Sequence, residues 1–284
     1  NEASLVLGVE KMSKKIGIIC GLGKLARYTA KNAYEKGHKV YIVAVQDNYD
    51  KQILKYSHSH CEVKIGQLSK AIKFFKQNEV KDVIMVGLIK HINIFKNLMP
   101  DLRAAKLLAL LKDKRAKSIL KSVISEFNKD GIKFMNSAYF LKDFLAKKGV
   151  LTKKKPSNNE QKDIIFGKKI AKIIANTDIG LTAIVSNQSV IAVEGMEGTD
   201  QCILRAGEIF GTTKEKVTTI TAVKVARDKQ DMRFDLPIIG KNTIKMMKTA
   251  GVRVLAIESG KTLILDKEEV IETANKNNIS IIAI

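Results

Sequence analysis

The chain has 284 residues, which suggests two domains or one large one, and its 45% hydrophobic content is enough for a real core. A net charge of +21 admits nucleic acid, an anionic membrane or a polyanionic substrate as partner, although a lysine-rich composition alone also explains it. The three cysteines and four histidines lack zinc spacing, and no apolar run reaches the ~20 residues of a spanning helix. We therefore expect a reduced, cytoplasmic protein without a structural zinc site.

The first half alternates strands and helices. We treat residues 1–11 as a non-native extension that precedes Met12, because they lack the basic start and long apolar core of a signal peptide. The apolar pattern then predicts strands at 16–20, 40–45, 83–86 and 132–135, and helices at 24–36, 68–78, within 101–130 and at 137–146. Such alternation favours a Rossmann-like parallel sheet, which we assign to an N-terminal domain of residues 12–146.

A charged stretch with one proline, residues 147–160, is the predicted linker. The C-terminal domain, residues 161–284, is predicted to be α/β with a mixed sheet. Its first helix spans 161–176 with Ser157 as cap, and a hairpin follows with Asn187-Gln188 at its tip. The remaining pattern predicts helices at 199–210, 243–249 and 268–277, and strands at 217–225, 252–257, 263–265 and 279–284.

The turn after the first strand reads Gly21-Leu22-Gly23-Lys24. A dinucleotide fingerprint needs a third glycine where Ala26 stands, so a nicotinamide cofactor is disfavoured. Two interpretations stay open, which are a contact with a phosphate or nucleotide and a tight turn that lets the helix pack closely. The pair His58 and His60 falls in a predicted polar loop.

The acidic residues of the second half gather near glycines and strand ends. If the segment is extended, Asp231, Arg233 and Asp235 project from one face, as residues two apart do in a strand. A local salt-bridge network is the alternative. Further upstream, Glu194, Glu197 and Asp200 surround two glycines; here the alternative is a strand-to-helix turn with Thr199 as cap.

This pattern favours one reaction class. Carboxylates at strand ends can hold a hard cation such as Mg²⁺, and Arg205 and Arg233 suit a bidentate grip on phosphate oxygens. No Ser/Cys-His arrangement suggests nucleophilic catalysis. We therefore predict metal-assisted hydrolysis of a phosphate anhydride.

Three segments resemble a known family: GIICGLGKLA (17–26), AVEGMEGTD (192–200) and KQDMRFDLPIIG (229–240). They are similar to the LpxI-type UDP-2,3-diacylglucosamine pyrophosphatases, and further similarity covers nearly everything after Met12. The chain departs from the family pattern at 112–120, which lacks a Gly-Asp-Asp, and at Leu181, where glutamine is common.

The resemblance implies an enzyme of lipid A biosynthesis that hydrolyses UDP-2,3-diacylglucosamine to UMP and 2,3-diacylglucosamine 1-phosphate, by water attack on the α-phosphate. It also implies two α/β domains, a homodimer and a need for Mg²⁺, with Mn²⁺ as a substitute. The catalytic aspartate of the family motif corresponds to Asp231 first and Asp235 second, with Arg233 between them. We assign substrate binding to Gly21, Gly23, Lys24, Thr199, Arg205, Lys229 and Gln230, and metal binding to Asp231, Asp200, Glu197 and Glu194.

Two other functions stay open at this stage. One is a non-catalytic relative that binds a nucleotide sugar or lipid; the other is a basic nucleic-acid binder. The second is disfavoured, because aromatic residues make up only 6% of the chain and no recognition motif is present. For a diacylated substrate we expect peripheral attachment to the anionic inner membrane, helped by the lysines.

Overall fold

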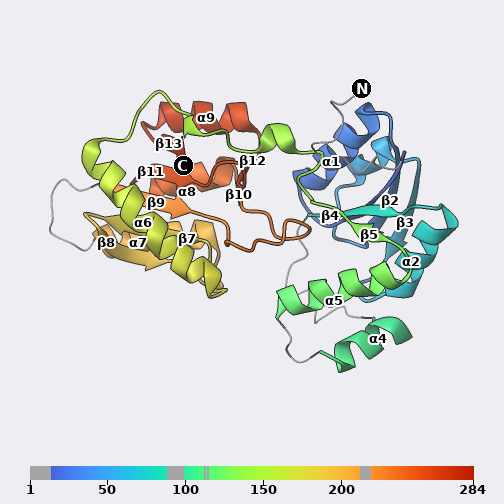
Figure 1. Cartoon of the computed structure of the whole chain (residues 1–284). Coiled ribbons are helices and arrows are strands. Elements are labelled where there is room, and N and C mark those ends of the chain that lie inside the picture. The colour runs from blue at the N-terminus through green and yellow to red at the C-terminus, as the bar shows by residue number, and fades with distance from the viewer. Residues whose placement is uncertain (1–13, 88–98, 112, 114, 212–218) are drawn as a thin grey trace, which may run out of the picture. The chain divides into compact units, whose positions relative to one another are not determined.

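The computed structural model describes residues 14–87, 99–111, 113, 115–211 and 219–284. The extension predicted at 1–11 lies outside these ranges. The chain forms two compact units, divided between Leu141 and Lys142 (Figure 1). Among the described residues, no helix combines the length and apolarity needed to traverse a bilayer.

The first unit contains a five-stranded sheet in the order β3-β2-β1-β4-β5, and every pairing is parallel. The strands are β1 (Lys15–Cys20), β2 (Lys39–Val45), β3 (Ser59–Val63), β4 (Asp82–Val86) and β5 (Lys133–Phe134). The two central apolar strands are almost completely buried, as expected where helices cover both faces of a parallel sheet. The predicted Rossmann-like parallel sheet is confirmed.

Helices connect these strands (Figure 1). They are α1 (Lys24–Glu35), the 3₁₀ helix η1 (Lys51–Tyr56), α2 (Leu68–Gln77), α4 (Leu102–Ala109) and α5 (Ala116–Lys129). Phe75 and Phe127, with ring centroids 6.4 Å apart, are fully buried and join α2 to α5 in the core. Aromatic contact of this kind stabilises a core beyond the area it buries.

Two predictions for this unit were wrong. The predicted polar loop around His58 and His60 contains β3, which pairs with β2 at the sheet edge and keeps its alternate residues partly exposed. The α-helix predicted at 137–146 does not form; turns precede a short 3₁₀ helix, η2 (Lys142–Phe144). At the start of this segment, the Ser137 hydroxyl donates to the Met85 carbonyl and the Asn136 side chain accepts from the Ala138 N–H. Such local side-chain bonds compete with helix formation.

The second unit contains a six-stranded mixed sheet in the order β6-β13-β11-β9-β7-β8. Its strands are β6 (Gly149–Val150), β7 (Thr182–Ser186), β8 (Ser189–Val193), β9 (Ile220–Lys224), β11 (Val252–Ile257) and β13 (Ser280–Ala283). The central three, β13, β11 and β9, are parallel, and antiparallel pairs flank them on both sides. A separate parallel pair joins β10 (Ile238–Ile239) to β12 (Leu263–Ile264). The mixed sheet agrees with the prediction.

Helix α6 (Asn158–Asn176) covers one face of this sheet (Figure 1). A capping box formed by Ser157 and Glu160 fixes its start, as the sequence suggests. Gly167 allows the close approach, since a Cβ there would lie 2.7 Å from a Val223 methyl carbon. Ile165 and Ile173 lie on the outer side of this helix, where each is 61% exposed.

The other face carries α7 (Thr199–Gly211), α8 (Lys241–Thr249) and α9 (Lys267–Lys276), whose buried Ile203, Met247 and Val270 belong to one apolar cluster with the sheet. The second unit therefore has three layers, with α6 on one face of the sheet and α7, α8 and α9 on the other. The residues predicted to link the domains, 147–160, belong to this unit, and β6 within them pairs with β13.

Candidate active site

Polar residues of the second unit gather where β9 ends and β7 begins. The antiparallel register places Thr182 opposite Lys224, and the Glu194 N–H donates to the Thr182 carbonyl at 2.8 Å. Glu194 directly follows β8, and Thr199 begins α7 five residues later. The ends of β7, β8, β9 and α7 therefore meet at the same edge of the sheet.

A buried lysine occupies this edge. Lys224 is only 5% exposed, and its ammonium donates to the Thr199 hydroxyl at 2.6 Å. That hydroxyl donates to Glu194 Oε1 at 3.0 Å, while the second Glu194 oxygen lies 3.8 Å from the ammonium. Burial lowers the pKa of Lys224 although the neighbouring carboxylates pull it upward. The Thr199 hydroxyl is thus already engaged on both sides.

The other acids of the Glu194–Asp200 segment also have internal partners. Asp200 accepts from the Thr243 hydroxyl at 2.9 Å and from the Asn242 amide. Glu197 pairs with Arg205 and accepts from the Gly195 N–H at 3.1 Å, and the hydrogen bond from Arg205 lowers its pKa. The second Arg205 contact is the Val193 carbonyl at 2.9 Å. These bonds fix the segment as the turn that leads from β8 into α7.

The segment around Asp231 is a turn, so the extended geometry predicted for it is wrong. The Asp235 N–H donates to the Asp231 carbonyl at 3.1 Å. Arg233 holds the Asp231 carboxylate in a fork, from Nε at 2.8 Å and from a terminal nitrogen at 2.7 Å. Asp231, Arg233 and Asp235 therefore do not project together as strand residues would, although the predicted ion pairing is present.

Arg227 and Gln230 close this turn from inside. The Arg227 side chain, 17% exposed, pairs with Asp178 at 2.7 Å and also contacts Asp235. Gln230 accepts from the Arg227 N–H at 2.8 Å and donates to the Asp235 carbonyl. The side-chain amide of Gln230 therefore links the two ends of the turn, whereas Lys229 beside it is exposed.

The base of the loop is tied to the neighbouring strand by Glu258. This residue follows β11, and its carboxylate accepts from the Ala226 N–H at 2.8 Å and from Lys172 and Lys261. Burial pushes the pKa of Glu258 upward, but the hydrogen bonds outweigh it and the pKa is lowered. Lys172 also binds Asp228, which extends the network to the exposed side of the loop. The loop that carries Asp231 therefore has a rigid base.

In the first unit, the predicted glycines lie where the sheet order reverses. Gly21 follows β1 and donates to the Val86 carbonyl at 3.0 Å, and a Cβ on Gly87 would lie 2.7 Å from the Gly21 backbone. Gly23 precedes α1 with φ 105°, which a residue with a side chain rarely adopts. Lys24 is exposed at the first helical position. In open α/β sheets, ligands bind at such a reversal point.

The four predicted metal ligands do not form a shared site. No group of three His, Cys, Asp or Glu residues suited to a metal ion occurs in the described part of the chain. Glu194, Glu197, Asp200 and Asp231 each contact donors of the protein instead, as given above. As they lie, these residues do not fit an all-protein cation cage.

Three residues that hold this region together were not predicted from the sequence, namely Lys224, Arg227 and Glu258. For two of them, the position in the sequence could have indicated this role: Lys224 ends a buried β-branched strand, and Glu258 directly follows another. A charged residue at such a junction is costly to bury without partners, so it indicates a network.

The fold and this edge define an α/β protein of two units, with a carboxylate- and arginine-rich loop at the strand ends of the second. The family models for the LpxI N-terminal domain and the LpxI C-terminal domain match residues 15–144 and 147–282. The chain therefore belongs to the LpxI family. A curated relative from Caulobacter vibrioides, named UDP-2,3-diacylglucosamine pyrophosphatase LpxI, is 28% identical over 278 residues, which is 95% of this chain and 98% of the relative.

Solved structures resemble the chain only distantly. An N5-carboxyaminoimidazole ribonucleotide synthetase in complex with ADP is 12% identical with a TM-score of 0.28, and the match covers 84% of this chain but 44% of that one. An isoflavone reductase is 11% identical with a TM-score of 0.31, over 96% and 78% of the two chains. At these scores neither likeness bears on function.

Proposed function

We propose that this protein is an enzyme that hydrolyses UDP-2,3-diacylglucosamine to UMP and 2,3-diacylglucosamine 1-phosphate. The observation that carries the proposal is the match of both LpxI domains along one chain, together with a relative that bears this activity in its name and aligns almost end to end. The proposed reaction is attack of water on the α-phosphate, which releases UMP.

In this proposal, Asp231 orients the attacking water or takes its proton, and Asp235 is the second candidate for that role. The two hydrogen bonds from Arg233 support Asp231 as the first candidate, because they fix the orientation of its carboxylate. Arg233 then acts mainly by positioning Asp231, which differs from the phosphate grip expected from sequence. The proposed substrate contacts come from Gly21, Gly23, Lys24, Thr199, Arg205, Lys229 and Gln230. Where the side chain of one of these residues already bonds within the protein, its backbone atoms make the contact.

A need for Mg²⁺, or Mn²⁺ in its place, is a separate proposal. Mg²⁺ is commonly held by one or two carboxylates plus the phosphates of a substrate rather than by a full protein cage. A requirement for the ion is therefore compatible with carboxylates that do not cluster. Excess chelator should stop UMP release, and added Mg²⁺ should restore it; full activity in chelator would reject the requirement.

The decisive experiment incubates the full chain with UDP-2,3-diacylglucosamine and Mg²⁺ and measures UMP. Asp231→Asn should lower kcat by about 100-fold, in the range of a lost general base. Asp228→Asn is the matched control, since Asp228 lies in the same loop but is exposed and bound to Lys172; its kcat should change by no more than ~3-fold.

Other outcomes have defined meanings. If Asp235→Asn is inactive and Asp231→Asn is not, the catalytic assignment moves to Asp235. Tight binding of the lipid without any UMP would make the protein a non-catalytic relative. Peripheral residence on the cytoplasmic face of the inner membrane and a homodimer complete the proposal; fractionation of cells and light scattering test them.

A further inference from the structure

Helix α4 carries apolar side chains on its outward face. The exposed positions, Leu102, Ala105, Lys106, Ala109 and Leu110, recur at the spacing of one helix face. Leu102 is 83% exposed and Leu110 is 84% exposed, although water-facing positions of a surface helix are normally polar. This face therefore has the composition of a covered surface.

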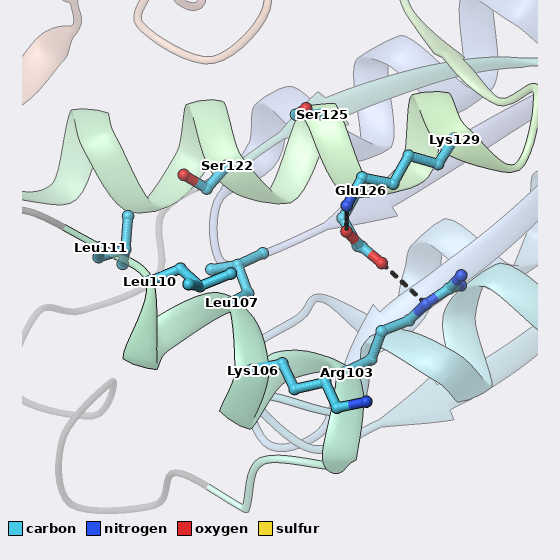
Figure 2. Close-up of a pocket in the computed structure, with 9 residues that line it drawn as sticks. All are labelled: Arg103, Lys106, Leu107, Leu110, Leu111, Ser122, Ser125, Glu126 and Lys129. Atoms are coloured by element: carbon cyan, nitrogen blue, oxygen red, sulfur yellow. Dashed lines mark hydrogen bonds and ion pairs between the residues drawn. The ribbon is translucent and has the colours of Figure 1, made fainter.

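Leucines of α4 also line a cavity beside the helix. Between α4 and α5 lies a cavity of about 340 Å³, which Figure 2 shows. It is lined by Arg103, Lys106, Leu107, Leu110, Leu111, Ser122, Ser125, Glu126 and Lys129. Three leucines from the end of α4 lie near the α5 serines, and the ion pair between Arg103 and Glu126, 2.9 Å long, bridges the two helices (Figure 2). Leucines at the end of α4 therefore border both the solvent and this cavity.

The charge around this surface favours a negatively charged partner. Residues 101–129 contain eight lysines and arginines but three acidic residues. Each of the three acids is engaged internally: Asp101 caps α4, Asp113 pairs with Arg115, and Glu126 pairs with Arg103 and Lys129. The surface thus combines exposed leucines with excess positive charge, the composition of helices that lie in the headgroup region of a membrane.

We propose that helices α4 and α5, Leu102–Ala109 and Ala116–Lys129, rest with Leu110 on the surface of an anionic lipid bilayer. Leu102 and Leu110 enter the interface, and the basic side chains lie among the headgroups. A second copy of the chain is disfavoured as the cover, because a symmetric contact would place two surfaces of like charge against each other. The proposal rests on the proposed function in that a diacylated substrate resides in such a bilayer.

The test is co-sedimentation of the full chain with vesicles of phosphatidylcholine and phosphatidylglycerol that contain no substrate. Leu102→Asp together with Leu110→Asp should weaken binding at least ~10-fold, since interfacial affinity follows buried apolar area and charge. Ile165→Asp with Ile173→Asp is the matched control, because these residues of α6 are also eight apart and exposed; it should change binding by less than ~2-fold. Vesicles of pure phosphatidylcholine, or high salt, should weaken binding of the unaltered chain.

Three results would overturn the proposal. They are unchanged binding by the Leu102/Leu110 variant, an equal loss in the control, or loss of a dimer in light scattering with vesicle binding intact. The last result would make the face a contact between copies. If the aspartate variant fails to fold, the same positions changed to serine replace it. The vesicles lack substrate, so failure of UMP release would reject the proposed function without affecting this result.

Discussion

Replacing Lys224 by methionine removes a buried charge of the second unit. Methionine retains the apolar stem but removes the ammonium, which donates to Thr199 and pairs with Glu194. The Glu194 carboxylate then keeps only its bonds from the Leu181 N–H, at 3.2 Å, and from the Thr199 hydroxyl. Among the residues that the structure describes, no other positive charge then pairs with this buried carboxylate.

The magnitude follows from the separation of the two charges. At 3.8 Å, with an effective dielectric constant of about 20, their attraction is about 4 kcal/mol. Relief from burying the ammonium offsets part of this, and removing one partner of a buried pair costs about 3 kcal/mol. We expect Lys224→Met and Glu194→Gln each to destabilise the second unit by about that amount. Together they should cost less than their sum, by about 2 kcal/mol.

The chain provides its own way to observe the second unit. It has no tryptophan, and all six tyrosines lie in the first unit. In urea, tyrosine fluorescence therefore follows the first unit, whereas circular dichroism follows both. Lys224→Met should shift the dichroism transition more than the fluorescence transition. Additive single substitutions, with a coupling free energy below ~0.5 kcal/mol, would refute the buried ion pair.

Three further predictions follow from contacts described above. Hydrogen bonds hold the pKa of Glu258 below its usual 4.5, so its stabilising contribution is present above that pH and is lost as pH falls through the lowered folded pKa; Glu258→Gln should flatten the acid limb of a stability–pH curve. Gly167→Ala should cost about 1–3 kcal/mol in urea unfolding, because its Cβ meets Val223, and loss below ~0.3 kcal/mol would mean that α6 shifts freely. Burial raises the pKa of Cys20 and of Cys202 to about 12, so in the folded state only Cys61 should react quickly with a thiol reagent at pH 8, and Cys61→Ser should remove that fast phase.

Much of the fold was predictable because local signals and tertiary structure agree. The apolar runs of β1 and β2, the Ser157 cap and the Asn187-Gln188 turn all form as the sequence suggests. Strand β3 was missed because its residues are polar and it lies at a sheet edge, where partial exposure relaxes the apolar pattern. Pairing with β2 decides its conformation, and no local sequence signal reports that.

The candidate site was harder to predict because its geometry depends on distant partners. Asp231 and Arg233 pair as neighbours in sequence, yet the turn that holds them is closed by Arg227 and its contact with Asp178, from the turn after α6. Strand β9 was predicted, but the role of Lys224 at its end depends on Glu194 and Thr199, which join it only through the β7 register and the start of α7.

The hairpin turn between β7 and β8 has a consequence for the order of folding. Asn187 and Gln188 both adopt left-handed conformations, and the buried Asp163 carboxylate of α6 accepts from both backbone N–H groups, at 3.1 and 2.7 Å. Helix and turn are only about 25 residues apart in the chain, so their docking requires a short loop closure, whereas β6 must find β13 across more than 120 residues. The helix and hairpin can therefore assemble early and offer β7 as the template on which β9 and the rest of the sheet are added. Substitution of Asp163 would then slow folding more than it speeds unfolding, which marks this corner as part of the nucleus.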